Sequence, residues 1–517
     1  MLRKKLYLLA VLILTFFLLC NFWLYSRFTV DDAFISWRYG KNLILHGIWN
    51  YNFSFFDLTQ SYTNPIFAAL SVPANLFNFD IVFFFKFFSI INIIIFFFWF
   101  IKKTRGSYVA LLLILAMPAT MVHAFSGLET FLYVSLMSVL FISLDNHKRN
   151  LSIILALILF LVRPESWILV FLIPIFFLVK KNFQFKDLIS LKIKLKLNDF
   201  IITLICLSVP LMLYLFYNKI YFGYSLPTSF YVKSNITFSI QKLITFLLFV
   251  LPLLLLLLKK RIKIFLIMIV FNIIVALNYS NSDLQSNYME RFSFQIFFPI
   301  YVFIIYFSEK RRDIIKVFLN KSAILTISFN KISKLVAIIF LLFLYVISGI
   351  TSAAHITSYP RMLASNAELG KVLSKIKNKY QIKSFVFGDA GMAAYHSDMN
   401  ALDNIGLGSA IVAHKNKLTY EVMDLYKPDL IVFMSSPEGI LTRQYSQDEM
   451  LRWANNNGLR YLCDIHFNTN SLLKLYSRFV SKELIDVCNN SKLTNDKKDR
   501  SYLYDIFKFP PWRYWTE

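Results

Sequence analysis

The chain has 517 residues, of which 57% are hydrophobic and 18% aromatic, and its formal net charge at pH 7 is +25. The apolar residues stand in long continuous runs, which excludes an ordinary soluble domain and indicates a polytopic membrane protein. A basic excess of this size is also typical of nucleic-acid-binding proteins, so the positions of the basic residues have to decide between the two classes.

About eleven apolar runs can each cross the roughly 30 Å hydrocarbon core as one helix, some of them with flanking residues. In chain order they are Leu6–Tyr25, Ile81–Ile101, Ser107–His123, Phe131–Leu144, Ser152–Val162, Trp167–Val179, Ile201–Tyr217, Leu243–Leu258, Phe265–Leu277, Phe292–Tyr306 and Leu335–Gly349. The first run follows basic residues and lacks a small-x-small cleavage site after Cys20, so we expect a retained signal anchor. The stretch Ile66–Phe77 is too short to cross, and we expect it to lie on the outer membrane surface.

The loops between the runs alternate in charge. Basic residues gather at 3–5, 102–105, 148–149, 180–196, 259–263 and 310–334, whereas the loops 27–80, 124–127, 163–166, 218–239 and 279–291 hold few. Under the positive-inside rule, the first set faces the cytoplasm and the second set faces outward. We therefore expect an inner-membrane protein with a cytoplasmic N-terminus, whose basic excess sets its orientation in the membrane lipid and does not bind nucleic acid.

The composition changes after Gly349, where acidic residues become frequent and helix and strand patterns alternate. We predict helices over 367–380, 420–426 and 450–457 and strands over 384–387, 430–434 and 460–465. The expected fold is mainly α: a polytopic membrane helix bundle over 1–350 and an extracytoplasmic α/β domain over 351–517 that buries its own core. Cys463 and Cys488 share this domain, and a disulfide and two free thiols both remain open.

Carboxylates near a bilayer are costly and usually have a function. In the membrane region, the acids that this topology places outside are Asp31, Asp32, Asp57, Asp80, Glu129, Glu165, Asp283 and Glu290. Short outer loops that are rich in carboxylates and poor in basic residues predict an active site or a cation site at the outer face.

The most distinctive local pattern is FTVDDAFISWRYGKNLILHG, from Phe28 to Gly47. Thr29 and Asp32 have the spacing of a capping box, and Gly47 suits the end of a helix. Asp31 and Asp32 would then lie in the first turn, where the helix dipole and free amides favour an ionised carboxylate that can act as a base near neutral pH. The alternative is that the two acids only cap a surface helix and pair with a base.

The string from Asp31 to Leu70, DDAFISWRYGKNLILHGIWNYN followed by SYTNPIFAAL, resembles the GT-C superfamily of glycosyltransferases, in particular the branch of the mycobacterial terminal arabinofuranosyltransferase. Further elements of that branch follow in order: SGLETFLY at 126–133, RPES at 163–166, LPTSFYVKS at 226–234, RFSFQIFFPIY at 291–301, and GDAGMAAYHS with ALDNIGLGS within 388–409. Two positions depart from the family pattern, with Ser166 in place of the common Gly and Pro227-Thr228-Ser229 in place of Pro-Asn-Thr.

The resemblance implies transfer of a sugar from a polyprenyl-phosphate donor to an envelope glycan, glycolipid or protein acceptor, with inversion in one displacement. It assigns the base to Asp31, while Asp32 would position the acceptor or a cation. No general acid is required, because the lipid phosphate is a good leaving group.

The leaving phosphate needs positive charge or a metal. The candidates are basic residues of the outer loops inside matched motifs, namely Arg38, Arg163, Lys233 and Arg291, with interfacial snorkelling as the alternative for each. Glu129 and Glu165 either contact a sugar or cation or only cap their helices. A divalent cation as cofactor stays open.

A transporter or flippase for a lipid-linked sugar is the rival class. Such a protein is expected to carry ionisable groups near the middle of the membrane in interrupted helices, often with repeat symmetry. The acids of this chain lie at helix ends on one side, and we find no repeat, which favours the transferase.

Overall fold

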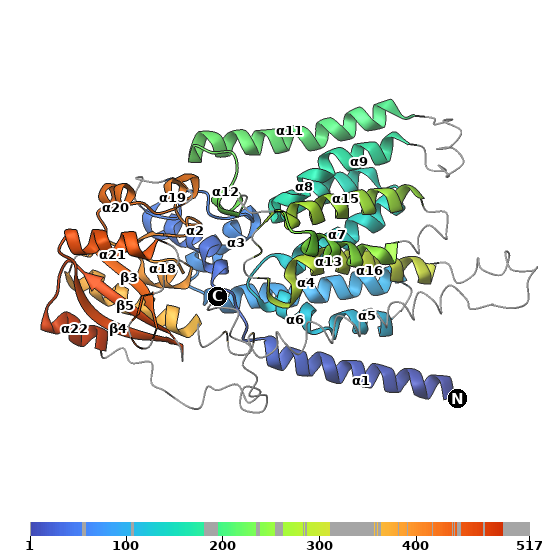
Figure 1. The fold of residues 1–517 in the computed structure, drawn as a ribbon. Coiled ribbons are helices and arrows are strands. Elements are labelled where there is room, and N and C mark those ends of the chain that lie inside the picture. Colours follow the sequence, from blue (N-terminus) through green and yellow to red (C-terminus); the bar gives the residue numbers. More distant parts are fainter. Residues whose placement is uncertain are drawn as a thin grey trace, which may run out of the picture.

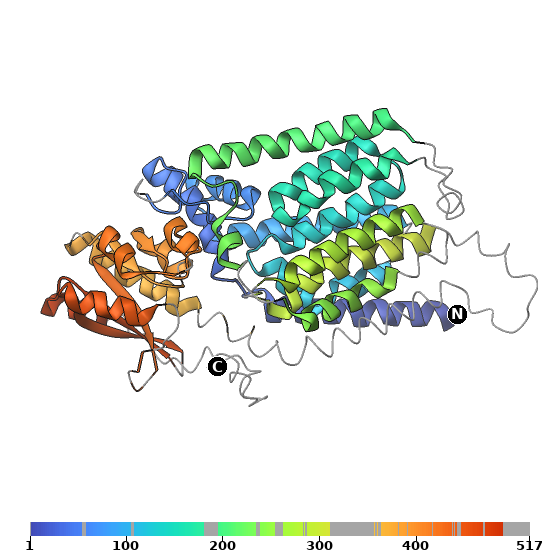
Figure 2. The ribbon, with the colours of Figure 1, turned by 45° about the horizontal axis from the view of Figure 1, so that its top comes forward.

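The structure is a computed structural model that describes residues 2–53, 58–104, 108–179, 195–233, 238–253, 262–282, 284, 287–310, 356, 359, 363–380, 382–389, 391–415, 417–436, 438, 440–441, 446–468 and 471–489. The described chain is mainly helical, with one small sheet in the C-terminal domain (residues 351–517). Figures 1 and 2 both show a bundle of long helices with the C-terminal domain at one of its ends.

The bundle consists of apolar helices that run in roughly one direction or its reverse (Figure 1). Its helices are α1 (Leu2–Tyr25), α4 (Ile81–Thr104), α5 (Tyr108–Leu115), α6 (Pro118–Phe125), α7 (Thr130–Asp145), α8 (Arg149–Val162), η1 (Pro164–Ile168), α9 (Leu169–Leu178), α11 (Leu197–Phe222), α13 (Ile240–Val250), η2 (Leu251–Leu253), α15 (Ile262–Ser280), η3 (Tyr288–Glu290) and α16 (Arg291–Lys310). The outermost helices leave large apolar side chains uncovered along their length, for example Phe16 and Met212, as suits a surface in contact with lipid.

Four of the described helices are long and apolar enough to span a membrane, so this is a membrane protein by composition and helix length. A fifth span results if α6 and α7, which meet at 114°, count as one broken crossing. The expected count of about eleven is not established by these helices. The run Ser107–His123 is divided into α5 and α6 because Pro118 has no backbone N–H to continue the first helix, and Leu335–Gly349 lies outside the described residues.

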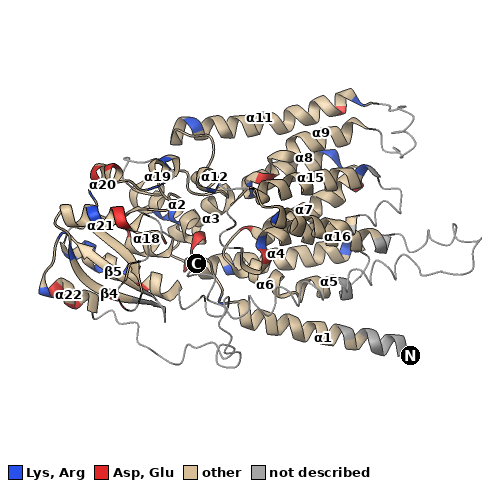
Figure 3. Ribbon diagram, viewed as in Figure 1, with Lys and Arg blue, Asp and Glu red and all other residues tan. Residues whose placement is uncertain are grey.

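The loops of the bundle form two groups, one at each end, and the loops of a group contact one another. Among the loops expected on the cytoplasmic side, Arg149 pairs with Asp199 at 2.6 Å and Asn146 donates to the Tyr306 hydroxyl at 3.0 Å. The charged residues of the bundle lie mainly at helix ends rather than along the apolar middle (Figure 3). This grouping agrees with the division that the loop charges predict.

The loops expected on the outer side meet at the other end of the bundle, next to the C-terminal domain. The backbone N–H of Val30 donates to the carbonyl of Ser126 at 2.9 Å, and that of Thr228 donates to Gln60 at 2.9 Å. The short helix α12 (Thr228–Lys233) lies in the same region. Every element that carries a predicted site residue therefore has one end here.

Two short helices lie between the bundle and the C-terminal domain, within residues 27–80, the segment that is expected to face outward and is called the first outer loop below. Helix α2 (Asp32–His46) ends at Gly47, which has φ 69° and so confirms the predicted stop. Its predicted capping box is wrong: Asp31 is the N-cap residue, without a side-chain bond to the helix, and the buried Thr29 hydroxyl has no hydrogen-bond partner among the described residues. Helix α3 (Pro65–Leu76), which covers the predicted surface stretch, packs on α2 and α8.

The close approach of α2 and α3 depends on a glycine. Gly40 donates its N–H to the Ser71 hydroxyl at 3.1 Å, and a Cβ at Gly40 would lie 2.2 Å from that oxygen. The pair forms a rigid platform that carries Asp31 and Asp32 at one end.

The C-terminal domain contains a five-stranded sheet with the order β2-β1-β3-β5-β4. The strands are β1 (Ser384–Val386), β2 (Asn400–Leu402), β3 (Leu430–Ser435), β4 (Arg460–Asn468) and β5 (Ser471–Ser477), and the helices are a helix over 363–380, α18 (Met392–Ser397), α19 (Ala410–Lys415), α20 (Tyr420–Tyr426), α21 (Gln447–Asn456) and α22 (Lys482–Asn489). Strands β2, β1 and β3 are parallel, whereas β5 is antiparallel to both β3 and β4. The structure pairs Cys463 with Cys488 in a disulfide, which joins β4 to α22.

The core of the C-terminal domain differs from the expectation that it is self-contained. One apolar cluster lies wholly within the domain, around Trp453 and Phe433. A second cluster combines domain residues such as Phe385 with Tyr39 and Tyr51 of the first outer loop. The first outer loop therefore completes the core of the C-terminal domain and holds that domain against the bundle.

Candidate active site at the outer end of the bundle

Asp31 is the centre of the candidate site, and the C-terminal domain surrounds its carboxylate. The backbone N–H groups of Gly391 and Met392 donate to the two carboxylate oxygens at 2.9 Å each, and the Asn366 amide donates at 3.2 Å. The Asp31 backbone N–H in turn donates to the Tyr359 hydroxyl at 3.2 Å. Asp31 is only 8% exposed, so its carboxyl is held by protein rather than by bulk water.

The protonation of Asp31 differs from the expectation that the helix dipole keeps it ionised. Burial, with repulsion from Asp389 and Asp32, raises the pKa of the Asp31 carboxyl to about 8, and the hydrogen bonds from Met392 and Asn366 only partly oppose this. Burial and the charge of Asp32 also raise the pKa of Asp389 to about 6. Three carboxyl groups therefore lie within electrostatic range of one another at this end of the molecule.

Asp32 is the first residue of α2 and is more exposed than Asp31. Its charge acts on Asp31, on Asp389 and on Arg291 of α16, which places it between the acidic group and the basic residues of the bundle. This position suits the expected role of Asp32, which is to orient a substrate beside the base.

Four predicted substrate-binding residues come together in one buried cluster, the Arg–Glu network of Glu129, Arg163, Glu165 and Arg291. Arg163 pairs with Glu129 and with Glu165 at 2.8 Å, and Arg291 pairs with Glu129 at 3.0 Å. Glu129 precedes α7, Arg163 and Glu165 flank the start of η1, and Arg291 begins α16. Two cations and two anions balance, so the network can lie at the end of a bundle without a net charge.

The Arg–Glu network is linked to helix α2. Asn64 donates to Glu129 at 2.6 Å and accepts a hydrogen bond from Ser36 of α2 at 2.7 Å. On the far side, Tyr279 donates to Glu165 at 3.0 Å. The helix that carries the Asp pair is thus connected through Asn64 to the network.

Two other predicted residues, Arg38 and Lys233, lie outside the Arg–Glu network. Arg38 is fully buried, where it donates to the carbonyls of Tyr51 (2.6 Å), Ala394 and Met399, so it joins α2 to the C-terminal domain. The expected role of Arg38 in substrate binding is therefore replaced by a structural one. Lys233 is partly buried at the end of α12, beside α19 of the C-terminal domain, and is not part of the Arg–Glu network.

Sequence reasoning missed the contribution of the C-terminal domain to the site. Asn366, Asp389 and Gly391 all approach Asp31, yet none was predicted as a site residue. For Asp389 and Gly391 the indication in the sequence was GDAGMAAYHS, which the resemblance matched without assigning a role, whereas Asn366 lies outside every matched motif. Asp57 and Asp283, predicted as outer acids, lie outside the described residues.

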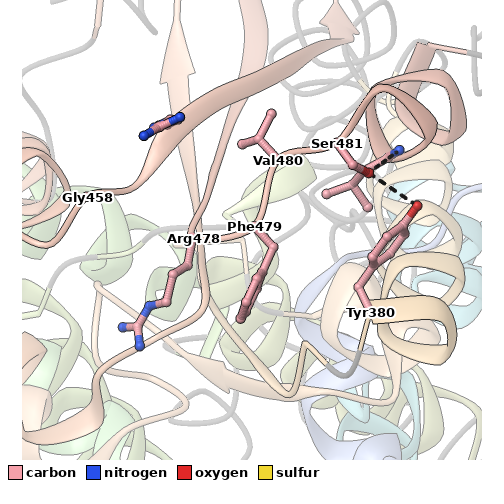
Figure 4. Close-up of a pocket in the computed structure, with 8 residues that line it drawn as sticks. Tyr380, Gly458, Arg478, Phe479, Val480 and Ser481 are labelled. Atoms are coloured by element: carbon pink, nitrogen blue, oxygen red, sulfur yellow. Dashed lines mark hydrogen bonds between the residues drawn. The ribbon is translucent and has the colours of Figure 1, made fainter.

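A cavity of about 460 Å³ lies elsewhere, on the surface of the C-terminal domain (Figure 4). It is lined by residues near the ends of β4 and β5 and by Tyr380, which accepts a hydrogen bond from Ser481 at 3.4 Å. Arg460, Arg478 and Phe479 in its lining are all exposed, and no predicted site residue contributes to it.

Within the part of the chain that the structure describes, no three His, Cys, Asp or Glu side chains are grouped so that they could hold a metal ion. No family model matches the chain, and no curated protein matches it. The site is therefore interpreted from its own geometry.

Proposed function

We propose that this protein is a membrane glycosyltransferase that moves a sugar from a polyprenyl-phosphate donor to an envelope glycan, glycolipid or protein acceptor at the outer face of the inner membrane. The observation that carries the proposal is the Asp31 carboxyl, which is buried, has a pKa of about 8 and lies at the bundle end where the acidic and basic groups of the outer loops meet. A general base is most effective when its pKa is near the working pH.

The reaction needs one base and one anion site. Asp31 takes the proton of the acceptor hydroxyl as its oxygen attacks the anomeric carbon. The bond from that carbon to the phosphate oxygen breaks, and the phosphate leaves with the electron pair. A single displacement inverts the configuration. Asp32, more exposed and beside the base, orients the acceptor hydroxyl.

Arg291 is the basic residue that best suits the leaving phosphate. It lies at the outer end of α16 and interacts electrostatically with Asp32, whereas Arg163 is enclosed between two glutamates. Glu129 holds Arg291 in place and balances its charge before the donor binds. Fixed cationic donors at a site with little water stabilise the developing charge of the phosphate.

The test is transfer from a synthetic polyprenyl-phosphate sugar in detergent, with donor binding measured in parallel. Asp31→Asn keeps the side-chain size but takes no proton, so turnover should fall by roughly 10²–10⁴ while donor affinity hardly changes. Arg291→Gln should weaken donor binding as well, because the phosphate charge is present in both the ground and the transition state.

The matched control is Asp398→Asn, which removes a partly exposed carboxylate that pairs with Lys377 at 2.7 Å and with His46. This change should leave turnover near that of the unaltered protein. If Asp31→Asn stays active while Glu129→Gln or Glu165→Gln is inactive but folded, the assignment of the base is wrong. If none of the three carboxylates matters, the transferase proposal fails in favour of transport of a lipid-linked sugar.

A further inference from the structure

The carboxylate of Asp31 faces the C-terminal domain, and three groups of that domain donate hydrogen bonds to it. Asn366 comes from the helix over 363–380, whereas the Gly391 and Met392 amides come from the start of α18. Two separate elements of the domain thus converge on Asp31. Both carboxylate oxygens accept at least one of these bonds, which fixes the plane of the carboxylate.

The backbone of Gly391 packs closely against Asp31. A Cβ at Gly391 would lie 2.1 Å from the Asp31 carbonyl oxygen and 2.4 Å from its carboxylate. Asn366 is 1% exposed. The approach of the Gly391 backbone to Asp31 therefore requires glycine.

We propose that the C-terminal domain forms part of the active site, because Asn366 and the Gly391–Met392 backbone act as positioning residues for the base Asp31. The inference rests on the proposed function of Asp31. It goes further because the reaction then depends on the C-terminal domain, in which no catalytic residue was predicted.

The charges around Asp31 explain why donors are needed there. The titratable groups that act on it are the carboxyls of Asp32 and Asp389 and the phenols of Tyr51, Tyr288 and Tyr359. None of these is a cation. The Asn366 amide also donates to Asp389, so a neutral donor stands between two carboxylates that repel each other. Without it, the ionised form of Asp31 would have one stabilising contact fewer.

Asn366→Asp tests the proposal, because it keeps the size of the side chain but replaces the donor with a carboxylate. Turnover at pH 7 should fall about a hundredfold, as expected for a displaced catalytic group. The acid limb of the pH profile should move upward by about one unit, because the added negative charge raises the pKa of Asp31. Donor binding should be unchanged, and turnover should partly recover at alkaline pH.

Asn52→Asp is the matched control. Asn52 is a buried asparagine of the first outer loop that exchanges hydrogen bonds with the Ala401 backbone at 3.1 and 2.8 Å, so it lies at the same interface without touching Asp31. This variant should lose stability and keep the acid limb of the unaltered protein. If Asn366→Asp has an unmoved acid limb and behaves like Asn52→Asp, the positioning role is overturned, while inactivity of Asp31→Asn would still support the proposed function.

A measurement without any substrate separates the two proposals further. Thermal unfolding in detergent at pH 9 compares Asp31→Asn, Asn366→Asp and the double variant. Because contacting residues couple, the destabilisation by Asn366→Asp should be smaller when residue 31 is asparagine. Strict additivity would overturn the inference and leave the proposed function standing, whereas near-normal turnover by Asp31→Asn would overturn the proposed function and, with it, the inference that rests on it.

Discussion

At the residue scale, the protonation and the contacts of Asp31 depend on its environment in the fold more than on its neighbours in the sequence. The Asp31-Asp32 pair could be identified from the sequence because it directly precedes a helix that ends at Gly47. The raised pKa could not be predicted, because it results mainly from burial under the C-terminal domain. The contacts to Asn366 and Gly391 join residues 335 and 360 positions apart, and no local pattern contains such information.

The pKa of Asp31 predicts opposite effects of pH on turnover and on stability. Turnover should rise about tenfold per pH unit below pH 8 and level off above it, since the base must be ionised. The pKa of Asp31 in the folded chain lies above its value of 3.8 in an unfolded one, so its contribution to stability is complete below pH 3.8 and is lost as the pH rises towards 8.

The measurement is the transfer rate and the thermal unfolding temperature of the detergent-solubilised protein between pH 5 and 9. Asp31→Asn should reduce the fall in stability over this range. Asp389 and Asp403, whose pKa values burial raises to about 6 and about 7, should retain part of that fall. An unfolding temperature with the same pH dependence in both proteins would contradict the raised pKa of Asp31.

At the element scale, periodicity predicted part of the C-terminal domain but missed the seven-residue strand β5 and the helices α18, α19 and α22. Helix α20 and strand β3 occur where the pattern placed them, as do β1, α21 and β4 within a few residues. The three-residue strand β2 was not predicted, and it forms because β1 offers it a parallel partner. For α2, the sequence predicted the helix end at Gly47 correctly. It assigned Arg38 to the substrate, whereas Arg38 binds backbone carbonyls of the C-terminal domain.

Arg38 provides the prediction at this scale. Arg38→Gln leaves buried carbonyls without a donor, so the unfolding free energy should fall by roughly 3 kcal/mol. Donor affinity should not change in the fraction that remains folded. The control is Arg149→Gln, which breaks a pair that is about one-third exposed on each side and should cost under about 1 kcal/mol. Thermal unfolding of the two variants is the measurement, and an equal loss of stability in both would contradict the structural role of Arg38.

At the scale of the whole molecule, the alternation of loop charge predicted which loops gather at each end, whereas it could not fix the number of crossings. Several runs fold as helices shorter than a membrane span, and proline divides one of them. Apolar composition shows which segments can enter the membrane, but it does not show where a helix breaks, because a break depends on an individual residue such as Pro118. The orientation of the bundle in the membrane stays a prediction from the positive-inside rule.

Cysteine labelling tests this orientation. In a chain with Cys20 and Cys206 replaced by serine, Asn281→Cys should react with an impermeant thiol reagent in intact spheroplasts, whereas Lys103→Cys should react only after permeabilisation. Both positions are exposed, so access to the reagent depends on the side of the membrane. Labelling of Lys103→Cys from outside would reverse the topology and remove the active site from the outer face.

The separation of 360 positions between Asp31 and Gly391 also sets the order of events during synthesis. The ribosome must complete every helix of the bundle before the amides that hold Asp31 exist, and in the expected topology those amides then have to be exported to reach it. A chain that stalls or is cut before Asn366 carries the carboxylate of Asp31 without any of these donors. Under the proposed function, unfinished copies in the membrane should be unable to consume the lipid-linked sugar, so that only a completed molecule draws on this pool.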